Sequence, residues 1–592
     1  WTGLPGHIRF DIGKFRQQFG ELNRWHLHAL SETEYPLAIR SYLGADGLAG
    51  TGISLYRAFG GLGTHEVTAQ VTRSETDSLF GGSGRPSYHV HLLNFWQLTR
   101  STYMQLGGTG LYGTNPGQSL RTKVGGVDFR LTWRPPARAL YREWTLRGEL
   151  YALRKEYAAS GATHLGYYVG TTYKLGSRAC VTTMSSTQTR PGSRGRLSRH
   201  SPCGRASGSS CGRSTPGPRR RGSTRRTRSP CRRFGRSDHT NTRPTDMLPF
   251  IPLLVALHGT PVPPADKVKV VTSLTTYAAI AREIVGERGT VSSIANGDEN
   301  PHYVQPKPSF VPTLSQADVF VTTGLDLELW VPALLDKANN PKVTEGGPGY
   351  VAAYAGIDLL DVPTSFSRAQ GDIHVYGNPH IWTGPLNAVQ IARNVLTGLK
   401  RVSPENADYF TQREKDFEDR MYRALFGDEL VKLLGGATLA DLDRQGKLFD
   451  FLQSKSYQGT ALATRLGGWL KEALPFRGKA VACYHKEWDY FSREYGLPCV
   501  DYIEPKPGIP PTPGHVLEVI NEMRDQHIQV LFSTNYYDRS QVLEVAQRTG
   551  AKAVIVPSNT NGAPGINSYF DLMNLWISEL ARAFGGGGPA AN

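Results

Sequence analysis

The sequence predicts an α/β fold for its C-terminal part, in which two parallel-sheet lobes are joined by a long backbone helix. Three observations lead to this organisation. Residues 266–585 alternate strand-like and helical segments, residues 1–180 alternate apolar and polar side chains, and residues 181–246 almost lack aliphatic side chains. Because a single hydrophobic core stops growing at about 250–300 residues, the chain of 592 residues is expected to contain several domains.

The N-terminal zone, residues 1–180, predicts an antiparallel β-barrel fragment. Val127, Phe129, Leu131 and Trp133 alternate with polar residues, so one face of an extended strand is apolar. Charged residues on the opposite face are typical of a barrel with a wet lumen, and a soluble β-sandwich is the alternative. The zone resembles outer-membrane proteins of Gram-negative bacteria, which implies an outer-membrane location for the fragment. The same alternation recurs over residues 144–152 and 163–175.

The second zone, residues 181–246, accounts for the basic composition of the chain. It holds 16 arginines, no lysine and two aspartates, and so contributes +14 of the formal net charge of +16. The remaining chain is nearly neutral, which argues against a nucleic-acid partner. With hardly any aliphatic side chains, the segment is expected to be disordered. It is interpreted as a frameshift or gene-fusion product, with a linker or a nucleic-acid-binding arm as alternatives.

Residues 247–265 form a short apolar segment that is rich in proline at its end. The segment is too short to span a membrane, and it resembles the apolar core and small-residue end of a secretory signal. A buried strand is the alternative. If the segment is a signal, an exported protein begins near Asp266.

Residues 266–585 show the β-α-β alternation that is typical of parallel sheets covered by helices. Helical stretches are expected at residues 274–285 and 515–526. Cys483 and Cys499 fall on successive predicted strands, and the sequence leaves open whether they pair. The strands are expected at residues 267–273, 291–295, 318–323, 479–484, 499–503, 529–533 and 552–557.

A helical region interrupts this alternation and divides it into two lobes. Leu386, Val389, Ala392 and Leu396 mark one face of a helix, and an amphipathic helix follows over residues 404–426. Ligands of parallel sheets bind where the carboxyl ends of the strands meet, so a site is expected between the lobes. We therefore expect lobe 1 at residues 266–400, the backbone helix with an insertion at 401–476, and lobe 2 at 477–592.

Three histidines lie at element boundaries in these two lobes. His302 and His380 each follow an Asn-Pro pair, and His485 follows the strand predicted at residues 479–484. They are separated by 78 and 105 residues, too far for a local zinc finger. Neutral imidazole nitrogens are good zinc ligands. Singly, each histidine is more often a structural residue, but together they predict a metal site between the lobes.

A series of motifs carries a family resemblance across this region. In chain order they occupy residues 266–273, 300–309, 324–330, 377–382, 485–492 and 536–539. On these motifs, residues 266–585 resemble the periplasmic metal-binding proteins of ABC-type zinc and manganese importers, the cluster with a single backbone helix. The resemblance implies a solute-binding protein of the periplasm, not an enzyme, whose partner is an ABC permease in the inner membrane.

The resemblance also implies a ligand set. His302 and His380 of the first lobe and His485 of the second are the implied metal ligands. Without a firm carboxylate, three imidazoles favour Zn²⁺ over Mn²⁺, because harder oxygen ligands suit manganese. The histidine-rich loop of some zinc importers is absent, and only His374 lies close before His380. The family's carboxylate position aligns with an asparagine, so the fourth position is left open between water, Asn559, Asp571 and Glu299.

Two other classes of function remain as alternatives. A zinc hydrolase also uses three histidines with an open water position, and Glu487 would be its general base, but the chain contains no His-Glu-x-x-His motif. A transport pore would be formed by residues 1–180. We expect this pore to fail, because an incomplete barrel leaves open strand edges that lipid does not tolerate.

Overall fold

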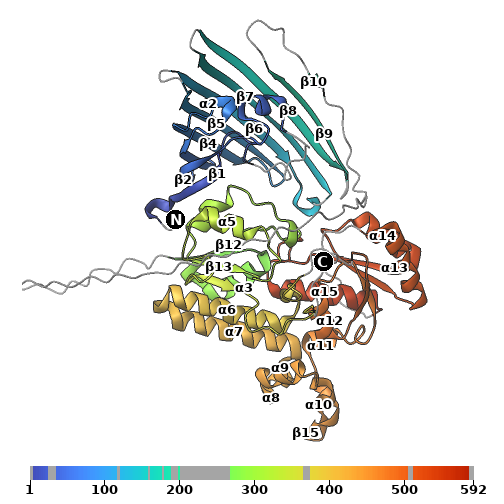
Figure 1. The fold of residues 1–592 in the computed structure, drawn as a ribbon. Helices are drawn as coiled ribbons and strands as arrows, with labels where there is room; N and C mark the ends of the chain where they lie inside the picture. Colours follow the sequence, from blue (N-terminus) through green and yellow to red (C-terminus); the bar gives the residue numbers. More distant parts are fainter. Residues whose placement is uncertain are drawn as a thin grey trace, which may run out of the picture. The chain divides into compact units, whose positions relative to one another are not determined.

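The computed structural model describes residues 4–24, 35–116, 120–139, 141–157, 160–175, 179–188, 198–199, 267–363, 374–504 and 511–585 (Figure 1). Residues 200–266 lie outside the described residues. They include most of the Arg-rich segment and all of the signal-like segment at 247–265. Among the described residues, no helix is both long enough and apolar enough to cross a membrane.

The N-terminal strands form one antiparallel sheet in which each strand pairs with the next in the chain. The strands predicted around residues 127–134, 144–152 and 163–175 correspond to β6, β7 and β8. Within the described strands no pairing joins β1 to β9 or β10, so the sheet is open. The strands are β1 (Arg9–Arg16), β2 (Ala49–Gly60), β3 (Thr64–Arg73), β4 (Pro86–Gln97), β5 (Thr102–Thr114), β6 (Arg121–Trp133), β7 (Arg142–Tyr157), β8 (Ser160–Leu175), β9 (Ala179–Gln188) and β10 (Ser198–Arg199).

The sheet extends beyond residue 180, where the sequence placed the end of this zone. Strand β9 pairs with β8 from Ala179 opposite Leu175 to Gln188 opposite Gly166. Residues 181–183 are Val-Thr-Thr, and such β-branched residues favour extended backbone. The arginines that set the predicted boundary begin only at Arg190, so the average composition of residues 181–246 concealed most of β9 and the two-residue strand β10.

The two faces of this sheet differ in polarity. Polar side chains such as Glu66, Gln70 and Asp128 are buried, whereas apolar side chains on the alternate positions, such as Val90 and Val127, are exposed. A small apolar cluster packs against the buried face. It includes residues of two helices, α1 (Leu37–Leu43) and α2 (Asp77–Phe80). The buried face therefore combines polar side chains with an apolar cluster, whereas the exposed face carries mainly apolar side chains.

Lobe 1 contains a parallel sheet in the order β12-β11-β13-β14. Its strands are β11 (Val268–Thr272), β12 (Gly289–Ser293), β13 (Val319–Thr322) and β14 (Tyr350–Ala352), and its helices are α3 (Thr275–Val285), α4 (Phe310–Ser315) and α5 (Val331–Ala338). The sequence predicts every strand except β14. That strand has three residues, too few to show a period.

Two long helices, α6 (Pro385–Val402) and α7 (Ala407–Phe426), follow lobe 1 and lie side by side (Figure 1). Of the predicted face of α6, Leu386, Val389 and Ala392 are buried and Leu396 is partly buried against the core. An insertion then leads to lobe 2. It contains α8 (Asp428–Leu434), α9 (Gly436–Arg444), α10 (Leu448–Ser454), a two-stranded sheet of β15 (Ser456–Tyr457) and β16 (Thr460–Ala461), and α11 (Gly468–Glu472).

Lobe 2 repeats the parallel arrangement in the order β18-β17-β19-β20. Cys483 of β17 and Cys499 of β18 form a disulfide with a Cα–Cα distance of 5.7 Å, which answers the question that the sequence left open. One continuous hydrophobic core includes residues of both lobes and of α6 and α7. The elements are β17 (Val481–Cys483), β18 (Cys499–Tyr502), β19 (Val530–Thr534), β20 (Lys552–Val556), α12 (Asp489–Tyr495), α13 (Pro513–Asp525), α14 (Arg539–Thr549) and α15 (Tyr569–Ala583).

Candidate metal centre

The structure brings the three histidines of the two lobes together. His302, His380 and His485 each offer one ring nitrogen, and these nitrogens all lie within 4.8 Å of one another. Four ligands at zinc bond lengths of ~2.0–2.1 Å are about 3.3 Å apart in a tetrahedral site. The group is therefore compact enough to hold one ion after small adjustments.

The repeated Asn-Pro-His sequence forms the same turn twice. Asn300 caps the 3₁₀ turn η5 (Pro301–Tyr303), and its side-chain oxygen accepts a hydrogen bond from the backbone N–H of His302 at 3.0 Å. The side-chain oxygen of Asn378 accepts from the backbone N–H of His380 at 3.1 Å, just before η7 (Ile381–Thr383). A side chain that folds onto the backbone two residues later fixes an Asx turn, which holds each histidine at the end of its segment.

Two of the imidazoles are oriented through their Nδ1 atoms. His380 Nδ1 lies 2.9 Å from the side-chain oxygen of Asn378, and His485 Nδ1 lies 3.3 Å from the backbone carbonyl oxygen of Glu504. Because both partners are acceptors, each Nδ1 carries the proton and donates it. The Nε2 lone pairs then remain for a metal. The sequence did not assign these orienting roles to Asn378 or Glu504, although the asparagine two residues before each histidine was a visible signal.

The Nε2 atoms of His302 and His380 lie only 3.1 Å apart. Without an ion, one of the two must donate its proton to the other, whereas a metal between them satisfies both lone pairs. His380 and His485 are 1% and 2% exposed, respectively, and His302 is half-buried. The centre is thus closed on the His380 and His485 sides and more accessible beside His302.

Burial keeps these imidazoles neutral. It lowers the pKa of His485 to about 3, and it lowers the pKa values of His302 and His380 well below that of a free imidazole. Neighbouring histidines lower the pKa of each further, because two positive rings in contact repel one another. Neutral imidazole is the form that binds a metal, so the site is prepared for a cation.

The three side chains proposed from the sequence for a fourth ligand have other partners. Asn559 is buried, and its Oδ1 accepts a hydrogen bond from Thr276 Oγ1 at 2.7 Å. Glu299 Oε2 accepts from the backbone N–H and the side-chain amide of Asn296, both at 3.1 Å. Asp571 caps α15, where its Oδ2 accepts from the backbone N–H of Ser568 at 2.8 Å. Neither carboxylate, of Glu299 or of Asp571, joins the three histidines in the group of ligand atoms within 4.8 Å.

Glu487, the general base of the hydrolase alternative, is fully buried. Its carboxyl group accepts hydrogen bonds from Tyr536 Oη at 2.5 Å and Thr534 Oγ1 at 3.2 Å. Burial raises the pKa of Glu487 to about 8, so the group is mostly protonated at neutral pH. A protonated and enclosed carboxyl group is a poor base for a metal-bound water.

Hydrogen bonds between the two lobes fix the segment that carries His380. Trp382 Nε1 donates to the carbonyl oxygen of Ser558 at 2.9 Å, and Tyr569 Oη donates to the carbonyl oxygen of Trp382 at 2.9 Å. Tyr490 Oη of α12 donates to the carbonyl oxygen of Asn378 at 2.7 Å. These buried bonds tie the His380 turn of lobe 1 to lobe 2.

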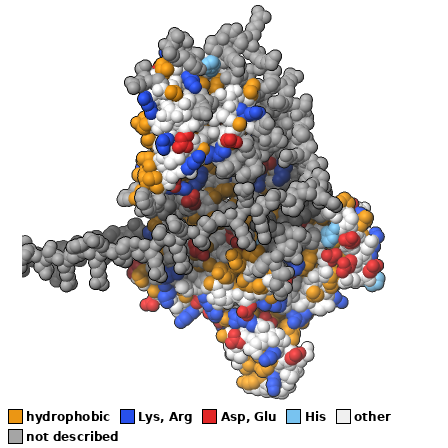
Figure 2. Space-filling model, in the orientation of Figure 1, with side chains coloured by type: hydrophobic (Ala, Val, Ile, Leu, Met, Phe, Trp, Pro, Cys, Tyr) orange, Lys and Arg blue, Asp and Glu red, His pale blue; other side chains and the backbone are white. Residues whose placement is uncertain are grey.

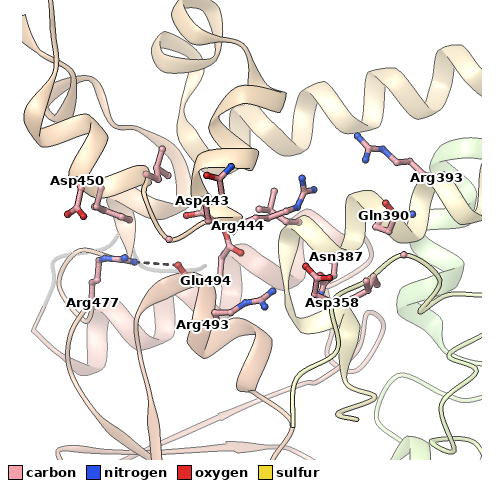
Figure 3. A pocket seen from close by; sticks show the side chains of 17 residues that line it. Asp358, Asn387, Gln390, Arg393, Asp443, Arg444, Asp450, Arg477, Arg493 and Glu494 are labelled. Carbon is pink, nitrogen blue, oxygen red and sulfur yellow. Dashed lines mark hydrogen bonds between the residues drawn. The ribbon is translucent and has the colours of Figure 1, made fainter. Parts of the chain in front are cut away.

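A polar hollow of about 680 Å³ lies elsewhere in this region, lined by the start of α6, by α9, α10 and α12 (Figure 3). Arg477 Nη1 donates to the backbone oxygen of Glu494 at 3.4 Å. Burial raises the pKa values of Asp443 and Glu494, and the neighbouring Asp443 carboxylate raises that of Glu494 further. None of the three histidines lines the hollow, so it is separate from the metal centre.

Comparison with known proteins identifies the region that holds the three histidines. The family described as zinc-uptake complex component A, periplasmic, matches residues 270–424 and 455–583. The iron-binding protein YfeA of Yersinia pestis is 24% identical over 328 residues, which cover 54% of this chain and 88% of the relative.

Two further relatives carry names for other metals. The manganese ABC transporter substrate-binding lipoprotein PsaA of Streptococcus mitis is 22% identical over 321 residues, covering 54% of this chain and 89% of the relative. The high-affinity zinc uptake system protein ZnuA of Bacillus subtilis (strain 168) is 22% identical over 327 residues, covering 53% and 87%. Residues 270–583 of this chain, apart from the insertion between residues 424 and 455, therefore belong to the family of periplasmic zinc-uptake components.

Proposed function

We propose that residues 267–585 capture a divalent transition metal in the periplasm, zinc in preference to manganese, and deliver it to an ABC permease in the inner membrane. The observation that carries the proposal is the gathering of three neutral imidazoles from two lobes within 4.8 Å. The matched family consists of solute-binding components of metal importers. Metal binding and transport in this chain thus rest on both the family and the site.

The donor set supports zinc as the preferred ion. His302, His380 and His485 supply borderline nitrogen donors, and no carboxylate oxygen joins them among the described residues. Imidazole suits zinc, whereas carboxylate and carbonyl oxygens suit manganese. The relatives named for iron, manganese and zinc show that the family scaffold accepts different ions. In this chain the ligands favour zinc.

Capture follows from the way in which the rings are held. Asn378 and the carbonyl of Glu504 keep the Nδ1 protons of His380 and His485 away from the centre, so their Nε2 lone pairs face an incoming ion. His302 lies on the more accessible side and supplies the third nitrogen. Because the ion is cargo and not a reagent, this part of the chain acts as a solute-binding protein and not as an enzyme.

Titration of the metal-stripped full chain with zinc and with manganese tests the proposal. We expect one zinc ion per chain, bound more tightly than manganese in direct competition. Inductively coupled plasma analysis after dialysis then finds zinc and little manganese on the protein. The absence of stoichiometric zinc binding would exclude the proposed function.

A second candidate function concerns the N-terminal sheet, where a specific observation favours contact with lipid, as in the outer membrane. Most outward positions in the middle of β2 to β8 are apolar, with Val127 53% and Tyr88 52% exposed. Charged side chains such as Glu66 and Asp128 lie on the buried face, and the exposed charges Arg57, Arg73, Lys123 and Arg154 lie toward strand ends. Figure 2 shows hydrophobic side chains along one flank of this region. We propose that this outward face contacts acyl chains. Its central members are Ile53, Leu55, Val90, Leu92, Leu106, Val127, Leu150, Leu165 and Val169.

Aromatic side chains at one end of the strands support this orientation. Trp133 of β6 lies opposite Trp144 of β7, which in turn lies opposite Tyr173 of β8. Such rows mark the level of the lipid headgroups in outer-membrane proteins. Soluble sheets bury their apolar face instead.

Flotation of the full chain with phosphatidylethanolamine and phosphatidylglycerol vesicles tests the lipid contact. We expect the chain to float with vesicles and Val127→Lys to reduce flotation strongly, because a lysine at mid-depth costs about 2–4 kcal/mol. Leu62→Lys is the matched control, since Leu62 is 99% exposed in the turn between β2 and β3. Equal flotation of both variants would contradict the proposal.

A further inference from the structure

The described structure places a fourth histidine against the three that gather in the metal centre. We infer that His374 is the fourth ligand and completes an all-imidazole site. The inference rests on the proposed metal capture and goes beyond it, because it assigns the position that the sequence left to water or to Asn559, Asp571 or Glu299.

Ring geometry carries the assignment. The imidazole of His374 stacks on that of His302, with ring centroids 5.2 Å apart and an interplanar angle of 22°. It lies edge-on to His380, with centroids 5.8 Å apart and an angle of 80°. His302 and His380, whose Nε2 atoms are 3.1 Å apart, have centroids at a similar 5.2 Å. The ring of His374 therefore packs directly against those of His302 and His380.

The backbone around His374 holds the residue beside the three histidines. The carbonyl oxygen of His374 accepts a hydrogen bond from the N–H of Gly377 at 3.1 Å. Gly377 has φ +113°, a conformation that side-chain-bearing residues rarely adopt, and the chain reaches His380 three residues later. The nitrogens of His374 are not among the ligand atoms that lie within 4.8 Å of one another, so ligation requires a rotation about its Cα–Cβ bond that unstacks the ring and turns a nitrogen toward the cluster.

The electrostatics of the cluster agree with this position. Repulsion from His374 is among the causes that lower the pKa values of His302, His380 and His485. The alternative fourth ligands act elsewhere. Asn559 Oδ1 is bonded to Thr276, Glu299 to Asn296, and Asp571 to the start of α15.

Four neutral imidazoles define the chemical class of the ion. They provide a tetrahedral nitrogen set without charge compensation and without a bound water, which suits zinc and leaves manganese without the oxygen ligands it prefers. His374 would thus be the residue that makes this site selective. A three-histidine site with water in the fourth position would discriminate less.

X-ray absorption at the zinc edge of the full chain tests the inference, together with the visible spectrum of its cobalt(II) form. We expect four imidazoles around zinc in the parent protein and three in His374→Asn. The cobalt spectrum should change with the loss of a nitrogen, and zinc affinity should fall at least about tenfold. His527→Asn is the control, because His527 is exposed in a turn of lobe 2 with φ +53°, which asparagine tolerates.

Three outcomes separate the inference from the function on which it rests. Four imidazoles in the parent protein and three in His374→Asn support His374 as a ligand. Three imidazoles in both, with unchanged cobalt spectra, overturn the inference while metal capture stands. No zinc bound by the parent protein overturns both. His380→Asn, measured in parallel, shows the effect of losing a ligand of the three-histidine group.

Discussion

At the scale of single residues, two asparagines position two of the three histidines. Asn378 contacts both the backbone N–H and the Nδ1 atom of His380, whereas Asn300 contacts only the backbone N–H of His302. The two Asn-Pro-His turns therefore look alike in sequence but differ in what they do to the ring. One orients an imidazole, and the other fixes only its backbone.

This difference predicts unequal effects of two matched substitutions. Asn378→Ala leaves His380 Nδ1 without its acceptor, and losing the partner of a liganding histidine typically costs 10–100-fold in metal affinity. We expect such a loss for Asn378→Ala and a smaller one for Asn300→Ala, both measured by competition with a zinc-binding dye. Equal affinities in the two variants would contradict the assigned roles.

The buried histidines also predict a pH dependence of stability in the metal-free protein. In the unfolded chain their imidazoles titrate near ~6.5, whereas in the folded chain the pKa of His485 is about 3 and those of His302 and His380 are also lowered. As pH falls below 6.5, the unfolded chain takes up protons that the folded chain does not, so folding loses stability. Above pH 6.5 the three imidazoles are neutral in both states, so they do not change the free energy of unfolding with pH.

Urea unfolding of the metal-stripped protein between pH 7 and pH 5 measures this effect. We expect the free energy of unfolding to fall toward pH 5, and to fall less in a variant with His302, His380 and His485 all replaced by asparagine. Carboxyl groups with raised pKa values, such as Glu487, are shared by both proteins and cancel in the comparison. Identical slopes would show that the three rings are not held neutral.

The sequence predicts the three histidines but not the role of His374. Residue type and the Asn-Pro context make His302 and His380 visible, and the preceding strand makes His485 visible. His374 follows no such pattern, and its place beside His302 depends on a turn closed by Gly377. The partners of Asn559 and Glu299 likewise depend on contacts across the fold, which sequence spacing does not encode.

At the scale of elements, the disulfide between β17 and β18 is a covalent constraint close to His485 in the chain. Cys483 ends β17, and His485 follows two residues later. Replacing both cysteines by alanine removes the cross-link, which joins positions that are 16 residues apart in the chain. A disulfide that closes a loop of this size stabilises a protein by roughly 3 kcal/mol. Without it, the end of β17 should be more mobile, and His485 should be held less firmly in position.

Chemical unfolding and zinc titration check this prediction. The double alanine variant should unfold at lower denaturant concentration and bind zinc more weakly than the parent protein. A reductant should reproduce both effects in the parent protein and add nothing to the variant. Unchanged unfolding of the variant would mean that the disulfide does not stabilise lobe 2.

The packing of α6 on β14 gives a second prediction at this scale. Replacing a glycine in a helix interior by alanine usually stabilises the protein by up to about 1 kcal/mol. At Gly398 an added Cβ would lie 2.3 Å from Val351 Cγ2, so the two elements would have to separate. We expect Gly398→Ala to destabilise by about 1–3 kcal/mol, and Gly398→Ala combined with Val351→Ala to recover part of the loss in thermal unfolding.

Most elements of the two lobes follow from sequence patterns, because short buried strands and amphipathic helices carry strong periodic signals. Strand β11 and helix α3 are found within one or two residues of the predicted ranges. Strand β14 is missed because three residues show no period, and β9 is missed because its polar threonines and serines were read with the Arg-rich segment. Local pattern fails where an element is short or its composition is shared with a neighbour.

At the scale of the whole molecule, composition misleads unless it is divided by position. The formal net charge of +16 comes mainly from residues 181–246, which contribute +14, whereas residues 267–585 hold 31 basic and 36 acidic residues and are acidic. The described chain combines a sheet with exposed apolar residues and a family domain with a buried imidazole cluster. We therefore assign separate functions to separate parts of the chain, with the proposed metal centre in residues 267–585.

The most direct test of this account is zinc titration of the metal-stripped full chain beside His302→Ala, His380→Ala and His485→Ala. We predict one tight site in the parent protein and a loss of more than tenfold, or about 1.4 kcal/mol, in each variant, because each removes one nitrogen of the cluster. Zinc affinity that stays undiminished in all three variants would contradict the central claim.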